Sequence, residues 1–411
     1  MRICLILCSF MLLTKPTYAS GIEVLPIKER CAYVYYPDSG LVNVNISFPL
    51  AGSLYTKEAV VAGTCVYLKA ALINSTTPDL QRDCNVIFYY DHNCLAIKLS
   101  SLPSAFLDVA TNLNMVFQNL RQRMFVSNWD IIKDALEEPL AAGLATSSPY
   151  IHFHGNQDPR LMDHDLTMED IYNHLNLLTK NNALIGISGD IDAKHALKGV
   201  NLLLDGLVDS DPAPPSAELL YLTVPDTTKL HYAKHDKEYA FVHFSIPDVS
   251  PADENYAINL LVASVLGDRL LHRTRGLEGL VYSSMQFQTD SLLQDSMLIS
   301  TTYCQEADVE KIIACFNAEV TRVITEGISI DELEKKKQET NDRSVMEYFG
   351  TPELAAASLM HLLYYKLPLD DFTKCSARIS ALSLERANEI AVQLFSRPFL
   401  KQIFTKTGTP A

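Results

Sequence analysis

Histidines and aspartates are concentrated between positions 152 and 174, in a pattern that could bind a metal ion. The group consists of His152, His154, Asp158, Asp163, His164, Asp165 and His174. Imidazole nitrogens and carboxylate oxygens are the ligands that zinc takes from proteins. His152 and His154 follow a Pro-Tyr pair, as in a surface loop, and His164 and His174 flank the start of the next predicted helix. We therefore favour an ordinary polar loop over a metal site.

A second pair of candidates, Arg275 and Tyr282, lies in the second half of the chain. Arg275 is predicted to end a helix and Tyr282 to start the next strand, while Gly276 and Gly279 permit a tight turn between them. Both side chains can then converge on one cleft. Alternatively, Arg275 only caps the helix and Tyr282 is a half-buried strand residue. His243 alternates with apolar neighbours and is interpreted as a core histidine. No Gly-x-Ser-x-Gly, phosphate-binding or Cys-x-x-Cys motif occurs.

The length and composition predict a large globular protein. Its 411 residues are 48% apolar and 20% charged, which excludes a disordered or fibrous chain and suggests two or three domains. The formal net charge of -15, from 34 basic and 49 acidic residues, argues against nucleic acid as a partner.

Residues 1–19 have the composition of a secretory signal peptide. Arg2 precedes an apolar run from Ile3 to Leu13, and a Thr-Tyr-Ala sequence ends at Ala19. The run is too short to cross a bilayer, and no later run reaches the roughly 18 apolar residues of a transmembrane helix. We expect an exported chain, periplasmic if it comes from a Gram-negative bacterium, with no transmembrane segment after removal of the signal.

Seven cysteines follow the signal. Cys84 and Cys94 flank a predicted hairpin and could form a disulfide in an oxidising compartment. The others are interpreted as small buried hydrophobic residues.

A proline-rich linker at 209–218 divides the chain into a domain at 20–208 and a domain at 219–411. An internal repeat supports this division, because a capped amphipathic helix followed by a strand ends each half. These pairs are predicted at 166–178 and 183–189, and at 382–395 and 399–405. The other predicted strands are 32–36, 42–48, 85–90, 239–245, 280–287 and 296–303, and the other helices are 256–266, 307–326 and the segment after Ser329. The fold class is α+β, with two homologous domains, each an antiparallel-rich sheet covered by helices.

In the order of these parts the chain resembles the insulinase/pitrilysin (M16) zinc peptidases, specifically their shorter two-domain subunits that work in pairs. The resemblance covers nearly the whole mature chain. It depends on the motifs Phe-Pro-Leu-Ala-Gly-Ser at 48–53, Gly-Asp-Ile at 189–191, the proline linker, and Arg-Gly-Leu-Glu-Gly-Leu-Val-Tyr-Ser at 275–283. It implies a domain pair that forms one half of a clamshell.

Catalytic members of that family carry His-x-x-Glu-His on a helix, where the two histidines bind zinc and the glutamate activates water. The matching stretch here is 63–76, and each chemical position has changed. Val66 and Ala70 stand in place of the histidines, and Lys69 stands in place of the glutamate. The resemblance therefore implies that this chain binds no zinc and that the zinc is held by a partner subunit.

The resemblance also gives Arg275 and Tyr282 a role, because paired members present these two residues to substrate beside the zinc of the other subunit. Two departures from the family pattern stand out. A glycine-rich run is compressed to Gly267, which suggests a shorter loop. Glu137 and Glu138 lie where a third zinc ligand would be expected, and we interpret them as a solvated helix face.

The leading hypothesis is a zinc-free subunit of a two-chain metallopeptidase that acts on unfolded peptides, paired with a catalytic subunit or with itself. The alternative is a non-enzymatic scaffold or binding protein with the same fold. The acidic composition, if it extends to the chamber wall, would favour basic peptides.

Overall fold

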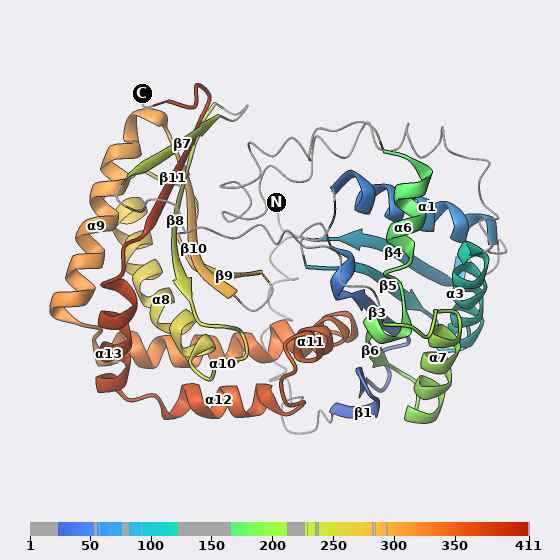
Figure 1. Cartoon of the computed structure of the whole chain (residues 1–411). Coiled ribbons are helices and arrows are strands. Elements are labelled where there is room, and N and C mark those ends of the chain that lie inside the picture. The colour runs from blue at the N-terminus through green and yellow to red at the C-terminus, as the bar shows by residue number, and fades with distance from the viewer. Residues whose placement is uncertain are drawn as a thin grey trace, which may run out of the picture.

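The computed structural model describes residues 24–52, 56, 58–75, 82–91, 93–121, 166–211, 227, 229–234, 238–281, 283, 285–292 and 295–409. Two mixed sheets, each with a helical layer on its outer side, form the two halves of the molecule (Figure 1). None of the helices in these ranges is both long and apolar enough to cross a membrane.

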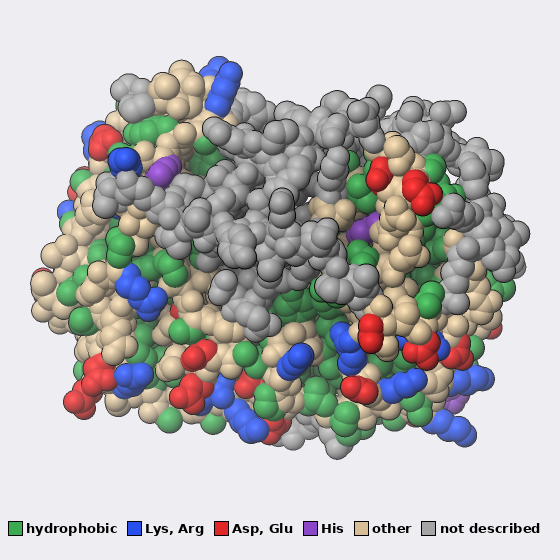
Figure 2. Space-filling view, in the orientation of Figure 1, with side chains coloured by type: hydrophobic (Ala, Val, Ile, Leu, Met, Phe, Trp, Pro, Cys, Tyr) green, Lys and Arg blue, Asp and Glu red, His purple; other side chains and the backbone are tan. Residues whose placement is uncertain are grey.

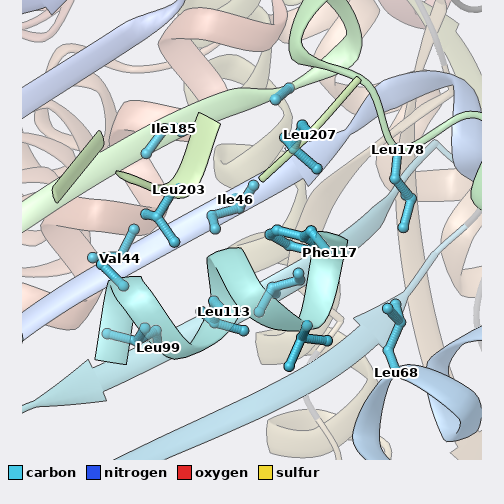
Figure 3. Close-up of a cluster of buried hydrophobic side chains, with 14 of the residues drawn as sticks. Val44, Ile46, Leu68, Leu99, Leu113, Phe117, Leu178, Ile185, Leu203 and Leu207 are labelled. Atoms are coloured by element: carbon cyan, nitrogen blue, oxygen red, sulfur yellow. The ribbon is translucent and has the colours of Figure 1, made fainter. Parts of the chain in front are cut away.

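The first sheet has six strands. In spatial order they are β1 (Val24–Lys28), β2 (Cys31–Tyr35), β6 (Leu184–Gly189), β3 (Val42–Phe48), β5 (Leu95–Ser101) and β4 (Cys84–Tyr90). Its outer layer consists of α1 (Glu58–Ser75), α3 (Phe106–Arg121), α6 (Met168–Leu175) and α7 (Ala193–Asp205). Alternate residues of β3, such as Val44 and Ile46, join leucines and phenylalanines of the helices in a closed apolar core (Figure 3). This alternation is the period-2 pattern that predicted the strand.

The second sheet repeats the order of the first. Its strands are β7 (Leu230–Lys234), β11 (Leu400–Thr405), β8 (Ala240–Asp248), β10 (Asp295–Cys304) and β9 (Phe287–Leu292). Its helices are α8 (Tyr256–Leu271), α9 (Val309–Glu326), α10 (Ile330–Phe349), α11 (Pro352–Tyr364), α12 (Asp371–Ala381) and α13 (Leu384–Phe395). In each sheet the strand that ends the repeat lies between one parallel and one antiparallel neighbour. Strand β6 is parallel to β2 and antiparallel to β3, and β11 is parallel to β7 and antiparallel to β8. The predicted α+β fold and internal repeat are confirmed.

Helix α11 connects the two halves. Although it lies in the second half of the sequence, it packs on the inner face of the first sheet, across β2, β6 and β3 (Figure 1). Leu359 and Leu362 of this helix are fully buried with Ala32 and Val34 in a separate apolar cluster. A side chain at Gly186 would not fit there, because its Cβ would lie 2.6 Å from the carbonyl oxygen of Ala356. The first sheet is therefore covered by helices on both faces.

The structure excludes a disulfide that the sequence left open and corrects one predicted strand. Cys84 and Cys94 are free thiols. They lie at opposite ends of the β4–β5 hairpin, since Cys84 is opposite Ser101 and Cys94 bonds to Asp91 at the turn. Seven residues of strand separate them by roughly 20 Å, far beyond the distance a disulfide can span. The strand predicted at 280–287 instead begins at Phe287.

Candidate functional site

Helix α1 contains the stretch that matches the zinc motif, and none of its three motif positions offers a ligand. Val66 and Ala70, one turn apart, are half-buried, and Lys69 beside them is exposed. The first two side chains have no lone pair to donate, and an ammonium group repels a divalent cation. Over the described ranges, no three His, Cys, Asp or Glu side chains come close enough together to hold a metal ion. Glu137 and Glu138 lie outside those ranges.

Helix α1 is fixed against α6 by close contacts near its motif positions. A Cβ on Gly63 would come within 2.9 Å of Leu166, so the two segments approach as closely as glycine allows. The ring of Tyr67 meets that of Tyr172 edge to face at 6.0 Å. These contacts keep the motif helix in place although its chemistry has changed.

His174 is a packing residue in this arrangement and not a metal ligand. Its Nδ1 lies 2.9 Å from the hydroxyl of Thr64, and its Nε2 lies 3.1 Å from the carbonyl oxygen of Ala51. Because a carbonyl oxygen only accepts, Nε2 carries the hydrogen and donates it. Burial lowers the pKa of His174 to about 4, so the ring is neutral at physiological pH. The other three histidines of the suggested metal cluster lie outside the described residues.

Arg275 lies on a widened turn that ends α8. The π-helical turn η6 (His272–Leu277) follows α8 directly, and the amide of Glu278 closes it by donating to the carbonyl oxygen of Arg273 at 3.0 Å. Gly279 then takes a positive φ of 64°, as the predicted tight turn requires. Arg275 is exposed on this turn. Its predicted companion Tyr282 lies outside the described residues.

The suggested shorter loop near Gly267 is not a loop. Helix α8 runs without a break through this position. An added Cβ on Gly267 would lie 3.1 Å from the backbone of Gln286, so glycine here allows close packing of the helix against the following segment.

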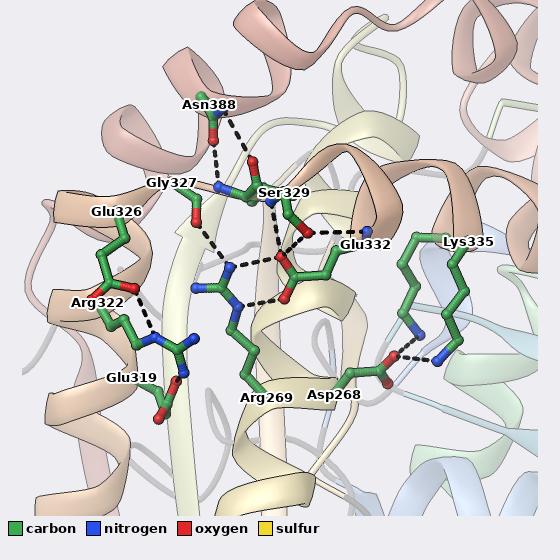
Figure 4. Close-up of polar contacts among 12 residues, drawn as sticks. Asp268, Arg269, Glu319, Arg322, Glu326, Gly327, Ser329, Glu332, Lys335 and Asn388 are labelled. Carbon is green, nitrogen blue, oxygen red and sulfur yellow. Dashed lines mark hydrogen bonds and ion pairs between the residues drawn. The ribbon is translucent and has the colours of Figure 1, made fainter.

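A groove of about 1190 Å³ surrounds Arg275, between α8, η6, α9 and α10. Its walls contain a dense set of ion pairs (Figure 4). Arg269 donates two 2.7 Å hydrogen bonds to the carboxylate of Glu332. These bonds lower the pKa of Glu332 to about 2. Glu319 is almost fully buried, yet it pairs with both Arg273 at 3.1 Å and Arg322 at 3.4 Å. The network ties α8 and η6 to α9 and α10.

Sequence reasoning did not find this network. Glu332 follows Ser329 at the spacing of a capping box, and its carboxylate accepts a hydrogen bond from the Ser329 hydroxyl at 2.8 Å. The i,i+3 and i,i+4 pairs within α9 and α10 could be read from spacing. The links from Arg269 and Arg273 to helices some 50 residues later have no local signal.

Comparison with known proteins identifies the fold. Residues 165–340 match the family model described as Peptidase M16 inactive domain. The peptidase M16 inactive domain from Pseudomonas fluorescens is similar over 93% of this chain and 97% of its own, with 14% identity and a TM-score of 0.72. A chain of Complex III2 from Candida albicans, with Inz-5 bound, is similar over 93% of this chain and 96% of its own, with 13% identity and a TM-score of 0.72. No curated protein sequence matches.

The periplasmic protease PqqL from Escherichia coli is also similar, with 15% identity and a TM-score of 0.64 over 94% of this chain. Only 48% of the PqqL chain is covered, so the present chain corresponds to about half of it. The resemblance drawn from the sequence motifs is confirmed for the fold: the chain is similar to M16 inactive domains both in the match at 165–340 and in its structure.

Proposed function

We propose that the chain is the zinc-free subunit of a two-chain M16-type metallopeptidase, exported to the periplasm. A partner subunit would supply the His-x-x-Glu-His helix and the zinc, which activates the attacking water. This chain would supply Arg275, Tyr282 and half of the substrate chamber. One observation carries the proposal: the motif helix α1 keeps its packing without any metal ligand, whereas Arg275 stands exposed in a large groove of the other half.

The two residues have complementary chemistry toward a peptide. A guanidinium group holds a carbonyl or carboxylate oxygen with a fork of donors. A phenolic hydroxyl can donate to the scissile carbonyl oxygen as negative charge develops there. Binding by Arg275 would orient the peptide, and donation by Tyr282 would stabilise the transition state. Neither step requires a metal in this chain.

The test is co-expression with M16-type chains that carry His-x-x-Glu-His. We expect a stable heterodimer, with zinc in the partner only and with peptidase activity that neither chain has alone. Arg275→Ala and Tyr282→Phe should each lower kcat/KM by roughly a hundredfold, without changing assembly or zinc content. Arg386→Ala is the matched control, because Arg386 is a half-exposed arginine on α13 whose partner, among the residues that the structure describes, is the neighbouring Glu389.

The scaffold hypothesis makes the opposite prediction. The similarity to a chain of Complex III2 is as high as that to the P. fluorescens domain, so the fold alone does not separate the two functions. A complex that forms with a zinc-binding partner but retains full activity with both substitutions would assign this chain to assembly alone.

A further inference from the structure

The charge of the Arg275 groove differs from that of the chain as a whole. The chain has a formal net charge of -15. The groove lining, by contrast, has more basic than acidic side chains. The basic residues are Arg269, Arg273, Arg275, Arg322, Lys335 and Lys336, and the acidic residues are Asp268, Glu278, Glu319, Glu332 and Glu339. An acidic protein thus carries a groove with a formal excess of one positive charge. On the face in Figure 2, by comparison, acidic and basic side chains are interspersed along the lower edge.

Nearly all of these charges are already paired inside the groove. Besides the Arg269–Glu332 and Arg273–Glu319–Arg322 contacts, Lys336 lies 2.7 Å from Asp268 and 2.8 Å from Glu339. Lys335 lies 3.6 Å from each of the same two carboxylates. A basic ligand would therefore have to break an existing ion pair to find an acid. Glu278 is the exception, because it has no ion pair with the described residues of the groove. It contributes to a raised pKa of Lys311, although Asp308 is the main cause of that rise.

Arg275 is the basic side chain of the groove lining that has no ion pair among the described residues. Among the described residues, no carboxylate or carbonyl oxygen accepts a hydrogen bond from its guanidinium, although its five N–H donors are exposed in the groove. A second surplus donor lies in the wall: Nη1 of Arg269 is buried and has no acceptor. This side chain is only 10% exposed. The groove therefore offers the donors of Arg275 and keeps a formal excess of one positive charge with the unpaired Glu278 counted.

We infer that the Arg275 groove binds a carboxylate of an extended peptide, either an Asp or Glu side chain or the C-terminal carboxylate. The inference deepens the proposed function and rests on it, because it names the class of peptide that this subunit would select. A carboxylate accepts two parallel hydrogen bonds from one guanidinium, which a neutral amide or a backbone carbonyl cannot do. The groove is also large enough for several peptide residues beside the charged group.

The inference can be tested by binding to the purified chain alone. Short dansyl-labelled peptides of one sequence would be compared in four forms: with Glu or Gln at one internal position, and with a free or an amidated C-terminus. Fluorescence anisotropy at low ionic strength gives each dissociation constant. We expect at least one acid form to bind about fivefold more tightly than its amide, and we expect this preference to weaken as salt is added. The internal and terminal pairs show which source of carboxylate is recognised.

Two variants make the result specific to Arg275. Arg275→Gln should abolish the preference for acid over amide, whereas Arg386→Gln removes the same charge from α13 and should leave the preference unchanged. Equal affinity for acid and amide forms, or no binding of any of the four peptides, would overturn the inference. So would an Arg275→Gln chain that keeps the preference but no longer pairs with its partner, since that result places Arg275 at the subunit interface. These outcomes do not decide the proposed function, which fails only if the pair's turnover is independent of Arg275 and Tyr282.

Discussion

Replacing Glu332 with Gln tests how strongly the ion-pair network holds the groove together. The side chain keeps its size but loses its charge, so the guanidinium of Arg269 keeps only one of its strong partners, the carbonyl oxygen of Gly327 at 2.8 Å. Arg269 is 90% buried as a side chain. A charge in that position without a counterion is destabilising, because water cannot replace the lost carboxylate.

The pKa of Glu332 gives the expected size of the effect. A fall from 4.5 to about 2 corresponds to about 3 kcal/mol of stabilisation at neutral pH if all of it acted on folding. The Glu332 side chain is 33% exposed, so solvent screening reduces this value. We expect a loss of about 2 kcal/mol in the free energy of unfolding at pH 7.

The pH dependence supplies an independent check. The pKa of Glu332 is lower in the folded than in the unfolded chain, so its stabilisation is full above about pH 4.5 and is lost as the pH falls toward 2. Urea unfolding, followed by circular dichroism, should therefore show a gap between wild type and Glu332→Gln that closes in this window. Glu339→Gln is the control, because Lys336 keeps Asp268 when Glu339 is neutralised. Equal urea midpoints for wild type and Glu332→Gln at pH 7, or a gap of constant size down to pH 2.5, would refute the reasoning.

Three further changes test the rest of the structure. Gly186→Val places a side chain against the backbone of α11 and should cost about 2 kcal/mol in urea unfolding; an unchanged midpoint would contradict the close packing of the halves. The pKa of His174 is lower in the folded than in the unfolded chain. The free energy of unfolding of wild type should therefore decline as the pH falls from 6.5 toward 4, whereas that of His174→Gln should stay level. The triple change of Val66 and Ala70 to His and Lys69 to Glu should not create zinc-dependent cleavage by the chain alone, because the supporting ligands are missing; zinc analysis and a peptide assay decide this.

The elements predicted best were those whose signals are local. Strand β3 has the predicted bounds, Val42–Phe48, because its apolar residues alternate and all point into one core. Helix α6 begins after Thr167, whose hydroxyl accepts from the amide of Asp170, so the N-terminal cap could be recognised from four residues. Helix α6 ends at Leu175, however, three residues before the end of the helix predicted at 166–178.

Predictions failed where the deciding contact is distant in sequence. Nothing local in the sequence of α11 shows that its buried leucines pack beside Ala32 and Val34, more than 300 residues earlier. The disulfide prediction had a similar weakness, because the positions beside a hairpin do not reveal the register of its strands. The spacing of the histidines was equally ambiguous, since His174 could be recognised as a packing residue only once Thr64 and Ala51 were placed beside it.

The two faces of α1 at the motif stretch differ in burial. Leu68 and Leu72 face the core, where any change of volume meets a fixed neighbour. Val66 and Ala70 lie on the half-buried side together with exposed Lys69, where a histidine can be lost without opening a cavity. Fold and metal chemistry therefore depend on opposite faces of one helix. The same separation means that an intact fold is no evidence of catalysis, so the proposed function has to be tested at Arg275 and Tyr282.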